Sequence, residues 1–221
     1  MCGRFAVTLP SDAMAQLFAG LPSNDLPDTP NFNVCPTNLV HVVTSQASQR
    51  RVRPMRWGFL PHWYKTPSDG PLLINARAET IAEKSAFRAA VRAQRCLIPA
   101  TGFYEWTKDA DGKRLPWYIA PTDSSVLAFA GIWQDWTKDE ASFTTCAIFT
   151  TPANPKLQAI HHRMPLILRA EDWPLWLGEA GHGAAALMTA APDEALDFHR
   201  VDPKVNSNRA GGAGLIEPIQ I

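Results

Sequence analysis

Proline is scattered along the whole chain, and this distribution limits the folds that the sequence can adopt. Nineteen of the 221 residues are proline. Proline has no amide proton and breaks a helix when it lies in the interior. We therefore expect short secondary-structure elements joined by many loops, and no series of long helices alternating with parallel strands.

The pattern of apolar residues predicts mostly strands. Asp109-Ala110-Asp111-Gly112 predicts a hairpin. Helices are expected at 11–17, capped by Ser11 and ended by Gly20, and at 78–94, 171–177 and 184–190, with a loop over 21–30. These elements predict an α+β fold, a single compact domain over residues 1–221 that is dominated by antiparallel sheet. The predicted strands are 39–44, 52–57, 96–99, 102–106, 117–120, 126–133, 143–150, 165–168, 198–201 and 215–219.

Charge is balanced over the chain but not along it. The sequence has 21 Lys and Arg against 21 Asp and Glu, so no overall positive field indicates a nucleic acid or a membrane. Residues 50–108, however, contain eleven basic and four acidic residues. This segment suggests a face for an anionic ligand, and a solvated surface of mixed charge is the alternative.

Several classes of protein lack a sequence signal. The four cysteines form no CxxC pair, so zinc-ribbon and thioredoxin-type motifs are excluded, and Cys35, Cys96 and Cys146 are expected to be buried and inert. The sequence has no GxGxxG, GxxxxGK[ST] or HExxH motif, so we expect no cofactor and no metal. It has no signal peptide, and its longest apolar run, 126–133, falls short of the ~20 residues that span a bilayer. We expect a cytoplasmic protein without membrane contact.

Cys2 is the residue with the most specific chemistry. Removal of Met1 would leave a free α-amine and a thiol on adjacent carbons. An α-amine has an ordinary pKa of about 7.7–8.0, so much of it is neutral near pH 7 and can attack an aldehyde. The thiol can then close a thiazolidine ring in an intramolecular step. The alternatives are acyl transfer, with the amine as base for the thiol, and an ordinary buried cysteine.

Six motifs occur in order along the chain: MCGRF at 1–5, FNVCPT at 32–37, RWGF at 56–59, INARAET at 74–80, GFYEW at 102–106 and HHRMP at 161–165. Together they resemble the SRAP family of abasic-site processing proteins. The resemblance implies that Cys2 traps the aldehyde of an abasic site in single-stranded DNA as a thiazolidine crosslink, with reversal and lyase activity. It also implies a β-rich, barrel-like fold with a DNA cleft. We expect a monomer that associates with the nucleoid when it is bound to DNA.

The resemblance assigns catalysis to Cys2, Asn75, Glu105 and His161. Aromatic neighbours could raise the pKa of Glu105 and suit it to proton transfer, whereas a solvent-facing position in a strand is the alternative. Asn75 can donate and accept hydrogen bonds without titrating, although asparagine also forms turns. His161 titrates near neutral pH and could protonate the departing sugar oxygen.

Basic residues within the motifs are candidates for DNA binding. By its chemistry, His162 could fill the catalytic role as well as His161. The family pattern assigns this role to His161 and usually has an acidic residue at position 162. The histidine found there could add positive charge near the DNA. Arg4, Arg77 and Arg163 are expected to hold phosphates, because a guanidinium group can bind them bidentately.

Aromatic residues are expected to supply the preference for single strands. Trp63 and Tyr64 stand where family members often carry exposed aromatic rings, on which bases stack. Burial in the core is the alternative for both rings. Pro36 and Thr150 match further family positions that line the cleft.

Three functions remain open. The first is the covalent sensor of abasic DNA. The second is an N-terminal-nucleophile cysteine peptidase that uses Cys2, Glu105 and His161. The third is a non-catalytic module that binds single-stranded DNA and has no need of Cys2. A peptidase has no use for an arginine-rich aromatic cleft, which favours a DNA ligand.

Overall fold

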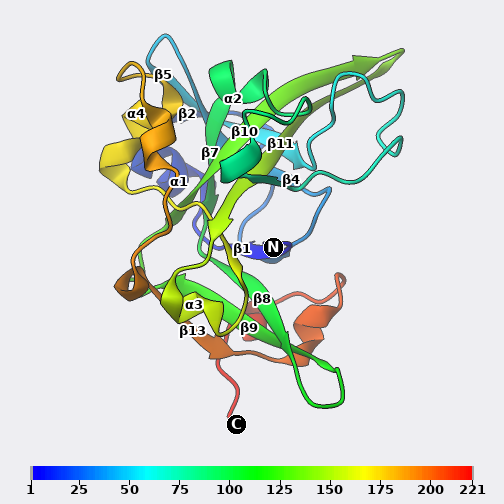
Figure 1. The fold of residues 1–221 in the computed structure, drawn as a ribbon, viewed down its shortest axis with the longest axis vertical. Coiled ribbons are helices and arrows are strands. Elements are labelled where there is room, and N and C mark those ends of the chain that lie inside the picture. The colour runs from blue at the N-terminus through cyan, green and yellow to red at the C-terminus, as the bar shows by residue number, and fades with distance from the viewer. Residues whose placement is uncertain (1, 221) are drawn as a thin grey trace.

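The computed structural model describes residues 2–220 as strands with short helices between them (Figure 1). The strands are β1 (Phe5–Val7), β2 (Gly20–Pro22), β3 (Asn31–Val34), β4 (Leu39–Gln46), β5 (Gln49–Trp57), β6 (Asn75–Arg77), β7 (Arg95–Ala100), β8 (Gly102–Lys108), β9 (Arg114–Pro121), β10 (Leu127–Lys138), β11 (Ala141–Pro152), β12 (Arg163–Pro165) and β13 (Leu196–Arg200). The helices are α1 (Ser11–Leu17), α2 (Ala90–Ala93), α3 (Pro155–Gln158) and α4 (Trp173–Leu177), and the 3₁₀ helices are η1 (Ala78–Thr80), η2 (Ala170–Asp172), η3 (Ala184–Leu187), η4 (Asp193–Ala195), η5 (Pro203–Asn206) and η6 (Ala213–Leu215).

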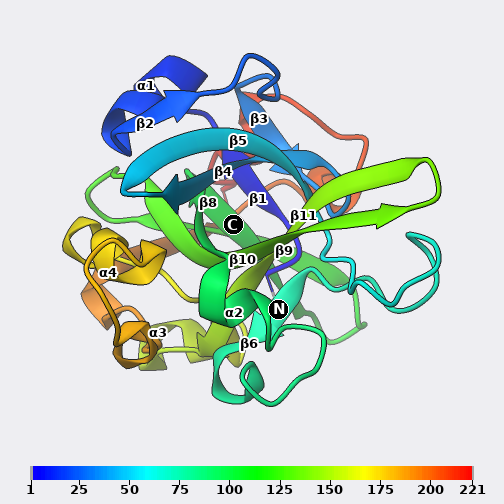
Figure 2. The same ribbon diagram turned by 90° about the horizontal axis from the view of Figure 1, so that it is seen from above.

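Five strands of the described chain close into a barrel. β11, β10, β7, β4 and β5 pair in this order, and β5 returns to β11. The pairs are antiparallel except for β11 with β5, where Thr145 lies beside Arg56 in parallel register. β6 and β12 also pair with β11, β6 parallel and β12 antiparallel to it. Figure 2 shows these strands from above.

A second sheet covers one end of the barrel, in the lower half of Figure 1. Its strand order is β13-β9-β8-β1-β3. Phe5 of β1 joins the two sheets, because its ring lies edge-on to Trp57 at 5.0 Å and to Phe129 at 5.9 Å. The chain just before β1 therefore lies at the seam between the barrel and the second sheet.

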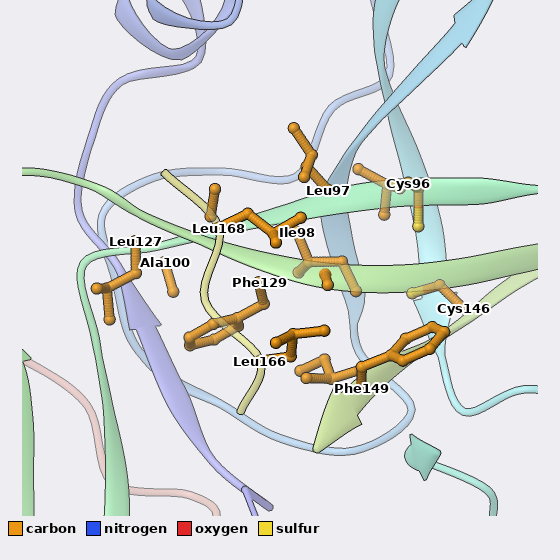
Figure 3. Close-up of a cluster of buried hydrophobic side chains, with 14 of the residues drawn as sticks. Cys96, Leu97, Ile98, Ala100, Leu127, Phe129, Cys146, Phe149, Leu166 and Leu168 are labelled. Atoms are coloured by element: carbon orange, nitrogen blue, oxygen red, sulfur yellow. The ribbon is translucent and has the colours of Figure 1, made fainter. Parts of the chain in front are cut away.

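The barrel interior is filled by apolar side chains. Figure 3 shows Ile98 of β7, Phe129 of β10, Phe149 of β11 and Leu166, which directly follows β12, gathered in one cluster, and each is completely buried. Burial of each such side chain contributes about 1.5–3 kcal/mol. The packing is tight at Gly131 of β10, where a Cβ atom would stand only 2.9 Å from the Cys96 sulfur.

The predicted fold class is confirmed: the protein is β-rich, mostly antiparallel and barrel-like, with short helices. The hairpin at 109–112 joins β8 to β9, with Gly112 at φ +78°. Strands occur at all but one of the predicted places, most of them longer than expected. β12 lies slightly earlier in the chain than the predicted 165–168.

The predicted helix at 78–94 is wrong as a continuous element. The segment forms η1, separate turns and the four-residue α2. Its buried side chains are Ile81, Phe87 and Ala90. Ile81 and Phe87 are six positions apart, so in a continuous helix their side chains would point to different faces. Each turn therefore packs on the barrel separately.

The ends of several other elements also differ from expectation. The predicted strand at 215–219 is wrong: η6 ends at Leu215, and an isolated bridge joins Val201 to Pro218, which has no amide proton to extend a ladder. The 184–190 helix is the shorter η3. Ser11 does not cap α1, because its hydroxyl lies 3.0 Å from His41 Nε2. Gly20 begins β2, which shortens the loop predicted over 21–30. Within residues 2–220, no helix is long and apolar enough to cross a membrane.

Candidate active site

Cys2 lies directly before β1, at the seam of the two sheets. β1 runs antiparallel to β8 with Phe5 opposite Phe103, and the Tyr104 amide donates a hydrogen bond to the Arg4 carbonyl at 2.9 Å. β8 continues from Tyr104 to Glu105, and the same register brings Cys2 alongside this part of the strand. The Cys2 residue is completely buried.

Asn75 holds the backbone of Cys2. Its side-chain nitrogen donates to the Cys2 carbonyl oxygen at 2.8 Å. Asn75 is the first residue of β6 and lies opposite Ile148 of β11, so the barrel wall fixes the position of the amide. This hydrogen bond joins residues 73 positions apart in the sequence, and the alternative of a simple turn residue does not apply.

Glu105 is a buried carboxyl on β8, with 3% of the residue exposed. Burial raises the pKa of this carboxyl, and the positive charges of His162 and Arg114 oppose the increase. Burial also raises the pKa of the Cys2 thiol, and the negative charge of Glu105 raises it further. The two groups are thus close enough to interact, and Cys2 is a neutral thiol near pH 7. The solvent-facing alternative for Glu105 is wrong.

His161 and His162 follow α3 with their rings stacked, 4.4 Å apart at the centroids. The Arg163 amide donates to His161 Nδ1 at 3.0 Å. Burial lowers the pKa of His161, and the charge of Arg163 lowers it further, against the effect of the Arg163 carbonyl, which lies 3.0 Å from Nδ1 and accepts a hydrogen bond from the protonated ring. A neutral imidazole at pH 7 follows. His162 is exposed, and His161 is the largest cause of the lowering of its pKa.

Arg163 is buried and paired. Its guanidinium forms a bidentate ion pair with Glu79, with 2.9 Å between Nη2 and Oε2. Nη2 also donates to the Thr150 carbonyl at 2.7 Å and to the Thr150 hydroxyl at 3.2 Å. Thr150 itself is completely buried. In the described structure both residues are therefore occupied within the protein rather than presented to a ligand.

The two other candidate arginines differ from each other. Arg4 Nη1 donates to Asn33 Oδ1 at 2.6 Å and to the Val205 carbonyl at 2.9 Å, so this half-buried side chain ties the second sheet to η5. Arg77 is exposed and shares a face of β6 with Asn75, because side chains two residues apart in a strand point the same way. Of the three arginines, Arg77 is the one presented to solvent.

A hollow of about 430 Å³ opens beside Asn75 and Arg77. Its lining includes the basic side chain of Lys84 and no acidic residue, with Leu73 and Phe87 among its apolar residues. A negatively charged ligand with an apolar part matches this composition.

The aromatic pair splits in the structure. Trp63 is 45% exposed, whereas Tyr64 is 8% exposed and packs in a small cluster with Leu60 and Trp136. The Tyr64 hydroxyl donates to the Pro71 carbonyl at 3.3 Å. The alternative of core burial therefore applies to Tyr64, and Trp63 keeps an accessible ring.

The other cysteines are mostly as expected. Cys96 and Cys146 are completely buried, but Cys35 is only half-buried, with its sulfur 3.3 Å from the Asn33 carbonyl oxygen. Pro36, next to it, is also half-buried. Among residues 2–220, no group of three or more His, Cys, Asp and Glu side chains is arranged to hold a metal ion.

Two residues of the site were not predicted from the sequence. Glu79 lies within the INARAET motif, two residues after Arg77. An acidic residue in this basic motif was the available signal for an ion pair. Arg114 lies 4.5 Å above the Trp106 ring and influences Glu105. No sequence signal indicated Arg114, because its place depends on the pairing of β8 with β9.

Together these features define a class of β-barrel protein with a cysteine near the start of the chain set beside a buried carboxyl and a carboxamide. The family model for SOS response associated peptidase (SRAP) matches residues 1–208. The chain belongs to the SRAP family.

Curated relatives match the chain over most of its length. It is 34% identical to "Abasic site processing protein YoqW" of Bacillus subtilis (strain 168), covering 98% of this chain and 99% of that protein. It is 30% identical to "Abasic site processing protein YedK" of Escherichia coli (strain K12), covering 99% and 100%. It is also 30% identical to "Abasic site processing protein HMCES" of Rattus norvegicus, covering 100% of this chain and 77% of that protein.

Solved structures share the fold. A crystal structure of a protein from Bacteroides thetaiotaomicron superposes with a TM-score of 0.85 at 24% identity, covering 99% of this chain and 100% of that one. A protein from Bordetella bronchiseptica superposes with a TM-score of 0.78 at 23% identity, covering 91% and 100%. These likenesses concern the fold alone.

Proposed function

We propose that this protein processes abasic sites in single-stranded DNA by forming a thiazolidine crosslink through Cys2 after removal of Met1. Membership of the SRAP family and the names of the curated relatives support abasic-site processing. The observation that carries the finer proposal is the setting of Cys2, whose carbonyl accepts a hydrogen bond from Asn75 and whose thiol interacts with Glu105.

The proposed reaction has two bond-forming stages. The α-amine of Cys2 adds to the aldehyde carbon of the open sugar, and the carbinolamine loses water to give an imine. The thiol then adds to the imine carbon as its proton passes to the nitrogen, which closes the ring. One water leaves overall, and no oxidant or reductant is needed.

The buried side chains suit the proton transfers of these stages. A carboxyl whose pKa is raised by burial, such as Glu105, is better suited than an ordinary carboxylate both to accept and to return a proton. It can take the thiol proton during closure and deliver a proton to the leaving hydroxyl. His161, neutral at pH 7 because burial lowers its pKa, serves as the base for the sugar hydroxyl in opening and reversal.

Exposed groups of the described structure suit a DNA strand. Arg77 can pair with a backbone phosphate, and the hollow beside it has basic and apolar lining residues. The exposed ring of Trp63 can stack with a base, a contact worth ~1–3 kcal/mol. We assign the DNA path to these residues. We propose that four less exposed residues hold the protein surface along this path in place: Arg4, Pro36, Thr150 and Arg163.

The test uses a single-stranded oligonucleotide with one abasic site. The protein should form an adduct that survives denaturing electrophoresis, with an intact mass equal to the sum of protein without Met1 and DNA, less one water. Cys2→Ala retains an amine and can form an imine but no thiazolidine, so its adduct should require borohydride reduction to survive. A stable adduct formed equally by Cys2→Ala, or by protein that keeps Met1, would contradict the proposal.

The other functions are separate outcomes of the same experiment. Peptide hydrolysis without an adduct would favour the cysteine peptidase. The exposed Arg77 and the basic hollow beside it suit a DNA strand and have no use in peptide hydrolysis. Salt-sensitive binding without a covalent product would indicate a non-catalytic module. Strand cleavage through the imine would reveal the lyase activity. A monomer in the cytoplasm is proposed with this function.

A further inference from the structure

The ion pair between Glu79 and Arg163 connects two parts of the proposed active site. Glu79 lies in η1, directly after β6, and β6 begins with Asn75, which holds Cys2. Arg163 begins β12, directly after the two histidines. β6 and β12 flank the same part of β11, where Thr150 pairs with both Arg77 and Pro165. The ion pair spans β11 from one flanking strand to the other.

Arg163 also orients His161 through its backbone. Its amide donates to His161 Nδ1 at 3.0 Å, while its side chain is held by Glu79 and Thr150. The backbone of Arg163 is held by the pairing of β12 with β11, where it lies opposite Pro152, and the ion pair adds a side-chain anchor to the residue whose amide contacts the imidazole. Removal of the Glu79 charge would leave Arg163 buried without its counter-ion.

We propose that Glu79 is a positioning residue, which fixes the His161 segment relative to the Cys2 segment through its ion pair with Arg163. This inference rests on the proposed function. Glu79 itself touches neither Cys2 nor His161 in any described contact and acts through Arg163. Loss of this anchor should slow the covalent steps without weakening DNA binding, because small displacements of reacting groups cost large factors in rate.

A competing role for Arg163 makes a different prediction. If Arg163 instead left Glu79 to bind a DNA phosphate, Glu79 would compete with the DNA. Glu79→Gln would then free the guanidinium and tighten DNA binding. The positioning role predicts unchanged binding and a slower covalent reaction.

The experiment separates binding from chemistry. Binding is measured with a strand that carries a tetrahydrofuran analogue of the abasic site, which has no aldehyde. The rate of crosslinking is measured with a true abasic site at saturating DNA. For Glu79→Gln we expect binding within twofold of wild type and a rate lowered by about tenfold or more. Glu79→Asp keeps the charge and should recover part of the rate.

Controls make each outcome decisive. Glu83→Gln changes an exposed acid on the neighbouring turn and should match wild type in both measurements. Thermal melting checks that each variant is folded; if Glu79→Gln does not fold, Glu79→Asp still reports, with an intermediate rate and unchanged binding. A wild-type crosslinking rate in folded Glu79→Gln overturns the inference but leaves the proposed function intact. DNA binding tightened tenfold in this variant does the same, because it indicates the competing role of Arg163. A wild-type protein that forms no adduct removes the proposed function and the inference together.

Discussion

The barrel interior and the seam around Cys2 are both buried, but they differ in chemistry. Cys96 and Cys146 lie in the barrel among apolar side chains (Figure 3). At the seam, Cys2 contacts the Asn75 amide and interacts with the carboxyl of Glu105. Burial raises the pKa of all three thiols. Of the three, only the Cys2 thiol has its pKa raised further by the charge of a carboxyl group.

We infer from this difference that burial by itself does not prepare a cysteine for the proposed reaction. The barrel supplies stability and a rigid wall on which β6 and β12 are mounted. The seam buries polar groups that need partners, and those partners bring together segments from distant parts of the chain. Substitutions in the two regions should therefore affect different properties.

The largest contrast is expected between two cysteines. Cys2→Ala should abolish the thiazolidine adduct because the ring requires the thiol, whereas Cys146→Ala should retain it. Denaturing electrophoresis after incubation with abasic single-stranded DNA measures both. Loss of the adduct in folded Cys146→Ala would break the distinction between the two regions.

A truncation in the barrel should act on stability. Phe129 is completely buried and contacts the rings of Phe5 and Phe103. Phe129→Ala should lower the free energy of unfolding by about 3–5 kcal/mol, as measured by urea denaturation. Phe143 is 37% exposed and its ring lies 6.0 Å from that of Trp136, so its replacement by alanine should lower the same free energy by a smaller amount, about 1 kcal/mol. A Phe129→Ala protein that is as stable as wild type would show that the barrel core is loosely packed.

Glu105→Gln should act on chemistry and on the pH dependence of stability. Loss of the proton carrier should slow crosslinking about 100-fold. The pKa of the folded carboxyl is raised above its ordinary 4.5, so its contribution to stability is present below that value and is lost as the pH rises through the folded-state pKa. Wild type should therefore lose stability relative to Glu105→Gln between acidic and neutral pH. Parallel stability profiles in urea titrations would contradict burial of an ionisable Glu105.

The smallest effect is expected at the rim of the site. Arg77→Ala should weaken binding to single-stranded DNA several-fold and make the dependence of log affinity on log salt shallower by about one. Arg169→Ala, which changes an exposed arginine beside α4, is the matched control and should leave both unchanged. An unaltered salt slope in Arg77→Ala would exclude a phosphate contact.

The predictability of the site varied from residue to residue. The aromatic run around Glu105 left burial and a solvent-facing position both open, and only the resemblance to the family favoured a catalytic role for Glu105 and for Asn75. The pairing of Arg163 was not predictable, because Glu79 lies 84 residues away and reaches it only when β6 and β12 flank β11. Trp63 and Tyr64 are adjacent in sequence, and only packing on Trp136 decides which ring is buried.

The alternation of short strands and turns, and with it the β-rich class, follows from the sequence, since both depend on local backbone preferences and on the spacing of apolar residues. The aminothiol chemistry available at Cys2 follows from the sequence as well. Which polar groups surround that cysteine, and which arginine remains open to solvent, depend on how the chain folds in three dimensions. Those relations depend on closure of the barrel, because closure brings together strands that the chain holds far apart.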